Sequence, residues 1–223
     1  MMAYLRITVA CATGLLLIVH GGAVDALAAP PDDEPAADAV KIPLDRIWGY
    51  SMPGTRDVQE LAADARSVPF MEIRRSIWSI PAKQTKAGPA FAVSGTELEA
   101  LRDVHSVLVN GKKPQQSFAA GSEIYVAFFS YANRPYVHLH NVERQGNTIN
   151  IRWRFVPHET EETTEHFALI PLGKLPIGKF HVNIIRSPMP QEYIDLGFRP
   201  TSDVVADRNV CKSFSFEVME EGK

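Results

Sequence analysis

Residues 136–156, YVHLHNVERQGNTINIRWRFV, contain two stretches in which apolar and polar side chains alternate. The stretches 136–142 and 148–156 both repeat with a period of two, and the turn-forming residues Arg144-Gln145-Gly146-Asn147 lie between them. A period of two places alternate side chains on opposite faces of a strand. The segment therefore predicts a hairpin of two antiparallel strands with one buried face.

The same period recurs throughout the C-terminal half of the chain. It predicts further strands at residues 123–130, 166–172, 179–186 and 213–219. Six strands joined mostly by short turns are typical of a β-sandwich or a small barrel. We therefore expect an antiparallel β-sandwich over residues 119–223.

Residues 40–118 show mainly the period of an α-helix, besides two short strand candidates at 40–44 and 90–93. Thr55 or Asp57 can cap a helix that begins near Val58, and Thr96 with Glu99 forms a capping box for another. Between them, a third helix, with a strand as the alternative, is expected from apolar residues spaced three, four and three apart: Phe70, Ile73, Ile77 and Ile80. The expected fold class is thus α+β, with a small helix-rich N-terminal region at 40–118 before the sandwich.

Residues 170–184, IPLGKLPIGKFHVNI, end one expected strand and begin the next through a Pro-Gly turn. This segment resembles the late strands of bacterial immunoglobulin-like and fibronectin-type-III-like modules, with Phe180 at the aromatic position. The final strand that the family places after it matches residues 214–218. The resemblance covers residues 123–219 and implies an immunoglobulin-like sandwich. It implies no particular activity, because such sandwiches have many unrelated functions.

The first 28 residues have the features of a secretory signal peptide. Arg6 precedes an apolar stretch at 7–19, and Ala26-Leu27-Ala28 follows as a cleavage pattern. An uncleaved anchor is the alternative, although the stretch is shorter than the ~20 residues of a membrane-spanning helix. Residues 29–39 are proline-rich and acidic, which predicts a flexible leader. These features predict a protein that is exported to the periplasm or the outside of the cell, and the absence of an N-x-[ST] sequon from the sequence favours a bacterial source.

The composition excludes several classes of protein. The 23 lysines and arginines against 26 acidic residues give a net charge of −3, which is not the charge of a nucleic-acid-binding protein. The chain has two cysteines, and Cys11 lies inside the signal peptide. A disulfide scaffold is therefore excluded, and Cys211 is expected to be buried or, as the alternative, to form an intermolecular link or a reactive thiol.

Three histidines are the candidate metal ligands. His138 and His140 lie two apart on one expected strand, and His181 lies on another, in a pattern that partly matches the two cupin motifs. The alternative is that they lie on the half-solvated face of a sheet. The acidic stretch 158–166, HETEETTEH, is interpreted as a solvated loop rather than a calcium site.

No catalytic residue is predicted, since the sequence contains no G-x-S-x-G elbow and no phosphate-binding loop. Trp78 and Trp153 are expected in the core, whereas Trp48, beside a turn, is the candidate exposed aromatic. Tyr193 and Phe198 are candidate contact residues in the long link 187–212, unless the link folds back over a sheet edge.

The sequence therefore predicts a non-catalytic interaction module without a cofactor, whose partner is a protein or a component of the cell envelope. Two alternatives remain open. One is a metal-dependent or other extracytoplasmic enzyme, and the other is a structural or assembly subunit of the envelope.

Overall fold

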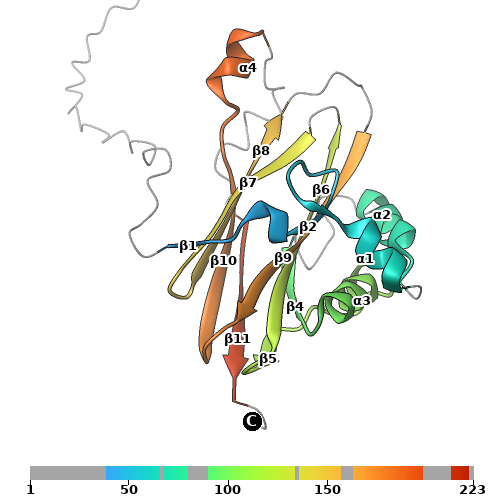
Figure 1. Ribbon diagram of the computed structural model, residues 1–223, viewed down its shortest axis with the longest axis vertical. Coiled ribbons are helices and arrows are strands. Elements are labelled where there is room, and N and C mark those ends of the chain that lie inside the picture. The colour runs from blue at the N-terminus through green and yellow to red at the C-terminus, as the bar shows by residue number, and fades with distance from the viewer. Residues whose placement is uncertain are drawn as a thin grey trace, which may run out of the picture. The chain divides into compact units, whose positions relative to one another are not determined.

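The computed structural model of this chain describes residues 39–65, 68–79, 90–133, 136–156, 163–197 and 212–220. The expected signal peptide, nearly all of the leader, Phe198 and Cys211 lie outside these residues. The described part is mostly β-structure, arranged in two packed sheets with helices on one side (Figure 1).

The first sheet, called sheet A here, has six strands. Their order across the sheet is β1 (Val40–Lys41), β7 (Tyr136–Gln145), β8 (Thr148–Val156), β10 (Gly178–Arg186), β11 (Lys212–Met219) and β5 (Ser117–Ala119). The second sheet, sheet B, has five. Their order is β3 (Arg56–Asp57), β2 (Trp48–Tyr50), β9 (Thr163–Lys174), β6 (Glu123–Asn133) and β4 (Ala90–Ser94).

All six predicted strands are confirmed, as β6 to β11. The predicted hairpin is β7 and β8, which pair antiparallel around a turn that contains Gly146. Gly146 has a φ of 55°, a conformation that glycine adopts without steric cost. The Pro-Gly segment leads into β10, and Phe180 lies fully buried in the core.

The sheets are mixed, so the expectation of an antiparallel sandwich is wrong in this respect. β8 pairs parallel with β10, β5 with β11, and β2 with β3. For the first pair the reason is topological. After β8 the chain crosses to sheet B as β9 and returns to sheet A as β10, and a return through the other sheet allows a parallel neighbour.

The first hydrophobic core lies between the two sheets. Its centre is made of fully buried side chains from both sheets, such as Ile149, Ile151 and Phe180 from sheet A and Ile124 and Ile170 from sheet B. Burial of this apolar surface is the main stabilising contribution to the packing of the sheets.

The second core lies between sheet B and three helices: α1 (Val58–Ala65), α2 (Phe70–Ser79) and α3 (Glu97–Leu108). On β6, Ile124, Val126 and Phe128 enter the first core, whereas Tyr125 and Phe129 enter the second. Sheet B is therefore buried on both faces. Because of this, residues 124–129 read as a continuous apolar run rather than an alternating strand.

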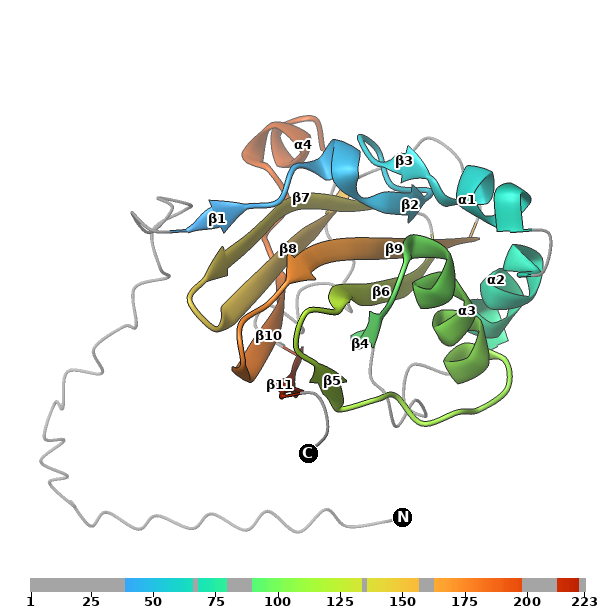
Figure 2. The same ribbon diagram turned by 60° about the horizontal axis from the view of Figure 1, so that its bottom comes forward.

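A small helix-rich N-terminal region in front of the sandwich is not supported. Figure 2 shows α1, α2 and α3 as a layer on sheet B, and the strands β1 to β4 of the same stretch pair within both sheets. The physical reason is that each amphipathic helix must bury its apolar face, and the outer face of sheet B is the apolar surface that receives it.

The local signals for the helix starts are confirmed. Asp57, rather than Thr55, caps α1, since its Oδ1 accepts a hydrogen bond from the Gln59 N–H at 2.8 Å. In the capping box of α3, Thr96 accepts from the Glu99 N–H at 3.3 Å and donates its own N–H to Glu99 Oε2 at 2.7 Å. These hydrogen bonds with Thr96 hold the pKa of Glu99 below its usual value.

Two short helices complete the described elements, the 3-10 helix η1 (Leu44–Arg46) and α4 (Gln191–Asp195), which follows β10. In the part of the chain that the structure describes, no helix combines the length and the apolar character that a membrane crossing requires.

Candidate functional site

The face of sheet A that points away from sheet B is polar. On β8, Ile149 and Ile151 are fully buried in the first core, so Asn150 and Arg152 project from the opposite face. On β10, Val182 and Ile184 are buried and Asn183 lies between them. We call this surface the outer face of sheet A.

A β-bulge on β7 sets which side chains reach this face. Leu139 is opposite Trp153 and Asn141 is opposite Arg152, so His140 is an extra residue without a partner position. The extra residue shifts the alternation by one position. Val142 consequently enters the core, and Asn141 and Glu143 lie on the outer face.

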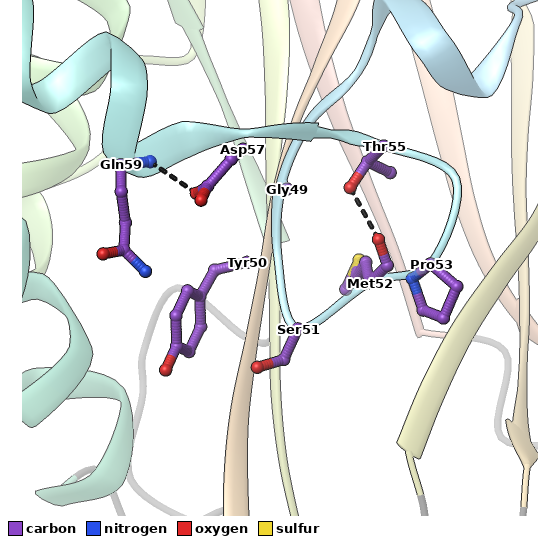
Figure 3. A pocket seen from close by; sticks show the side chains of 8 residues that line it. All are labelled: Gly49, Tyr50, Ser51, Met52, Pro53, Thr55, Asp57 and Gln59. Atoms are coloured by element: carbon purple, nitrogen blue, oxygen red, sulfur yellow. Dashed lines mark hydrogen bonds between the residues drawn. The ribbon is translucent and has the colours of Figure 1, made fainter.

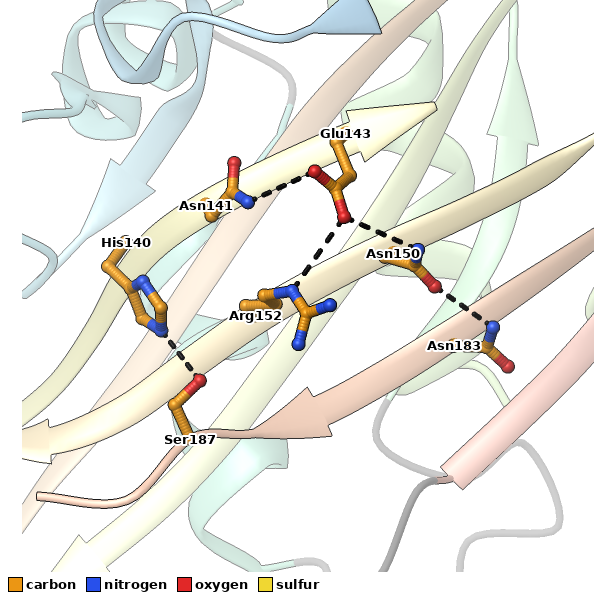
Figure 4. Close-up of polar contacts among 7 residues, drawn as sticks. All are labelled: His140, Asn141, Glu143, Asn150, Arg152, Asn183 and Ser187. Atoms are coloured by element: carbon orange, nitrogen blue, oxygen red, sulfur yellow. Dashed lines mark hydrogen bonds and ion pairs between the residues drawn. The ribbon is translucent and has the colours of Figure 1, made fainter. Parts of the chain in front are cut away.

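Five polar side chains from three adjacent strands form a connected ladder on this face (Figure 4). The Glu143 carboxylate accepts hydrogen bonds from the Asn141 and Asn150 side-chain amides, at 3.3 and 3.5 Å. Arg152 Nε lies 3.7 Å from Glu143 Oε1, and the Asn183 amide donates to Asn150 Oδ1 at 3.0 Å. Glu143 is only 9% exposed, an unusual burial for a carboxylate on the outer side of a sheet. These neighbours hold its charge in a fixed position.

A second polar contact lies beside the ladder. His140 Nε2 is 2.8 Å from Ser187 Oγ, which joins the bulge of β7 to the residue directly after β10 (Figure 4). The distance is that of a hydrogen bond between a base and a hydroxyl group.

The structure does not bring the three candidate metal ligands together. His138 is opposite Arg154 on β8, whereas His181 is opposite Thr148, six residues and roughly 20 Å away along the same strand. His181 instead contacts the Ser215 hydroxyl at 2.9 Å. Within the residues described, no group of three histidine, cysteine, aspartate or glutamate side chains is placed to hold a metal ion.

Two of the aromatic candidates, Trp48 and Trp78, differ from expectation. Trp48 is buried, at 5% exposure, with the Arg56 guanidinium 3.5 Å from its ring centre. Trp78, expected in the core, is 52% exposed, and Trp153 packs partly buried against the first core as expected. Tyr193 lies half-buried on α4. Trp48 is therefore unsuited to stack on a ligand without a rearrangement of Arg56.

A hollow lies over the loop between β2 and β3, lined by Tyr50, Ser51, Thr55, Asp57 and Gln59 among others (Figure 3). The polar side chains of Thr55 and Asp57 in this hollow already form hydrogen bonds within the turn and at the start of α1. The Thr55 hydroxyl donates to the Met52 carbonyl at 2.7 Å, and Asp57 caps α1. We interpret the hollow as a consequence of this turn rather than as a reactive site.

His166 is a buried histidine that the sequence did not single out. Its Nε2 accepts the Val137 N–H at 3.4 Å, so Nδ1 carries the hydrogen and donates to the Ser51 carbonyl at 2.9 Å. Burial lowers the pKa of His166 to about 4, which keeps the ring neutral. Ser51 has a φ of 54°, rare for a residue other than glycine, and His166 helps to hold it there.

The ladder was not predicted from the sequence, although a signal for it exists. Asn141, Asn150 and Asn183 all lie inside strands, where asparagine is depleted. Three asparagines at outward positions of strands indicate side chains kept for their hydrogen bonds rather than for strand stability.

Comparison of the chain with protein-family models, with curated proteins and with solved structures finds no match.

Proposed function

We propose that this chain is an exported, non-catalytic binding module of the immunoglobulin-like type, and that it binds its ligand on the outer face of sheet A. The observation that carries the proposal is the ladder of Asn141, Glu143, Asn150, Arg152 and Asn183. These side chains pack against neither hydrophobic core, and they are fixed relative to one another by a rigid sheet.

The arrangement suits recognition of a polar ligand. Amide and carboxylate side chains offer donors and acceptors at fixed spacing, and preorganised groups lose little conformational entropy on binding. In the described residues, α1, α2 and α3 pack on sheet B (Figure 2), and the side chains of Asn141, Asn150, Arg152 and Asn183 are partly exposed. The partner class predicted from the sequence, a component of the cell envelope, is compatible with such a surface.

The test is a binding screen of the mature chain against arrays of soluble glycans and peptides, with two variants. Replacing both Asn150 and Asn183 with alanine should abolish binding of any retained ligand. Arg75→Gln, an exposed position on α2, away from the outer face of sheet A, is the control and should bind as the wild type does. Equal binding by the ladder variant, or no ligand in either array, would overturn the proposal.

The immunoglobulin-like relation is supported by two packed sheets and by the predicted late strands β10 and β11. The parallel pairs depart from the expected antiparallel pattern. Export is supported by the apolar stretch and the Ala26-Leu27-Ala28 pattern alone. N-terminal sequencing of the protein from its host checks it, with cleavage after Ala28 or Ala29 as the expected result.

One contact favours a second candidate function, a serine hydrolase. Ser187 Oγ and His140 Nε2 lie within the distance at which a histidine activates a serine nucleophile. A fluorophosphonate probe tests this candidate, since an activated serine is labelled and Ser187→Ala removes the label. Absence of labelling of the wild type would leave the binding module as the proposal.

A further inference from the structure

The outer face of sheet A carries positive charge at the end of the ladder that Arg152 forms. Arg152 and Arg154 lie two residues apart on β8 and therefore share one face. His138 is directly opposite Arg154 on β7, at a position where the Cβ atoms of paired residues are ~5 Å apart. Three side chains that can carry positive charge thus lie within reach of one another.

Arg152 and Arg154 differ in whether a carboxylate of the described residues lies near them. Arg152 lies 3.7 Å from Glu143, but the ion pairs of the described residues include no carboxylate for Arg154. Arg154 Nε is also shielded from solvent and has no hydrogen-bond partner in the part of the chain that is described. Buried charged donors are nearly always paired, because an unpaired one loses its hydration without compensation.

The pKa of His138 also indicates that this cluster favours a negatively charged ligand. Burial first, and then the positive charge of Arg154, hold the pKa of His138 below its ordinary value. The two side chains therefore experience each other's charge. A negatively charged group placed between them would relieve this repulsion and pair with Arg154, for which the described residues supply no carboxylate.

The ligand chemistry follows from what lies next to this cluster. The planar fork of an arginine matches a carboxylate in a bidentate manner. The amides of Asn141, Asn150 and Asn183 continue from Arg152 across three strands, and amides of this kind pair with hydroxyl groups. A carboxylate beside several hydroxyls is the chemistry of an acidic sugar.

We propose that Arg154, His138 and Arg152 form a carboxylate subsite, and that the outer face of sheet A binds a saccharide that contains uronic acid. This inference rests on the proposed function, since it names the ligand class of the same face. The carboxylate pairs with Arg154, and the sugar hydroxyls lie along the asparagines of the ladder.

The test follows the ring signals of His138 by NMR in the mature chain while pH is varied, with three probes. The probes are trigalacturonate, its uncharged counterpart trigalactose, and inorganic phosphate. With trigalacturonate, the pKa of His138 should rise, because bound negative charge favours the imidazolium. By linkage, trigalacturonate should bind more tightly as the pH falls through that pKa. Trigalactose and phosphate should bind at least tenfold more weakly.

Arg154→Gln is the decisive variant, and Arg75→Gln, which removes the same charge from an exposed position on α2, is its control. Loss of a charge-assisted hydrogen bond should weaken trigalacturonate binding about 10- to 100-fold in Arg154→Gln. Without ligand, this variant should also show a raised pKa of His138, which verifies that the two groups interact in the folded protein. The control should behave as the wild type.

The outcomes separate this inference from the proposed function. Equal binding of trigalactose and trigalacturonate, with Arg154→Gln unaffected, would overturn the carboxylate subsite and leave a binding face. Equal binding of phosphate would overturn the saccharide assignment. If no probe shifts any signal from the outer face of sheet A, the acidic saccharide is excluded as the ligand, and only the array screen then decides the proposed function.

Discussion

The outer faces of the two sheets have opposite chemistry. On sheet B, Tyr125, Phe129 and Phe167 project outward into a second core that the helices complete. On sheet A, the equivalent outward positions of the central strands carry Glu143, Asn150 and Asn183. One sandwich therefore has an outer face used for stability and an outer face that contributes little to the hydrophobic core.

This difference explains why the helices lie where they do. Covering apolar surface is favourable, whereas covering the ladder would remove polar groups from water. The helices accordingly pack on sheet B, and the polar side chains of the ladder lie outside both hydrophobic cores. The comparison predicts that substitutions on the two faces affect different properties, stability for sheet B and binding for sheet A.

The largest effect is expected on the face of sheet B. Phe167 is fully buried and contacts the ring of Phe70 edge to face, with 6.0 Å between ring centres. Phe167→Ala should lower the free energy of unfolding by about 3–5 kcal/mol, as measured by urea denaturation. Glu217→Ala, exposed on the outer face of sheet A, is the control and should change it by less than about 0.5 kcal/mol. Similar effects of the two substitutions would contradict the contrast between the faces.

The second-largest effect is a loss of stability at low pH, caused by His166, which joins β9 of sheet B to β7 of sheet A. The pKa of His166 is about 4 in the folded chain and near 6.5 when unfolded, so the unfolded state binds the proton first as the pH falls. Stability is therefore complete above pH 6.5 and is lost as the pH falls toward 4. Between pH 7.5 and 4.5 the loss should be about 2–3 kcal/mol.

The matched variant for this prediction is His166→Gln, whose amide can donate to Ser51 but does not titrate. Between pH 7.5 and 4.5, the free energy of unfolding of this variant should fall by about 2–3 kcal/mol less than that of the wild type. Identical pH dependence would show that His166 is protonated alike in both states.

A smaller effect is expected in the ladder. Glu143→Gln removes the negative charge near Arg152 but keeps the shape of the side chain. It should lower the free energy of unfolding by about 1–2 kcal/mol, the range for a partly buried hydrogen-bonded charge. Urea denaturation at pH 7 measures it, and a loss as large as that for Phe167→Ala would mean that the ladder is part of the stabilising structure.

The smallest effect concerns the helical layer over sheet B. Thr96→Ala removes the capping box of α3 and should cost about 1 kcal/mol, whereas Thr96→Ser should be nearly neutral because it keeps the hydroxyl. Thermal unfolding of the two variants compares them. Equal loss in both would show that the threonine methyl group, rather than the cap, stabilises the helix start.

Much of the local structure could be predicted from the sequence. Strands such as 148–156 were found with their observed bounds, because their inward and outward positions alternate with a period that only a strand has. The capping box of Thr96 and Glu99 was found because both hydrogen bonds depend on residues three apart. Such signals are contained in short stretches of chain.

The candidate site could not be predicted in the same way. The spacing of His138 and His140 predicts metal ligands, yet the bulge at His140 and the distance to His181 separate them from any shared centre. Asn150 contacts Asn183 only because β8 and β10 are neighbours, 33 positions apart in the chain. Outward-facing asparagines were visible in the sequence, but their mutual contacts were not.

The sequence by itself determined the longer strands β6 to β11, the helices α1 to α3 and the inward side of β8. Only the tertiary structure decided that β8 and β10 run parallel, that three helices cover sheet B, and that Trp48 is buried while Trp78 is exposed. The physical reason is that the spacing of apolar residues shows which face of a strand or helix is buried. It does not show which other element packs against that face. The neighbour of each strand and the covering layer are chosen by the free energy of the whole packed chain.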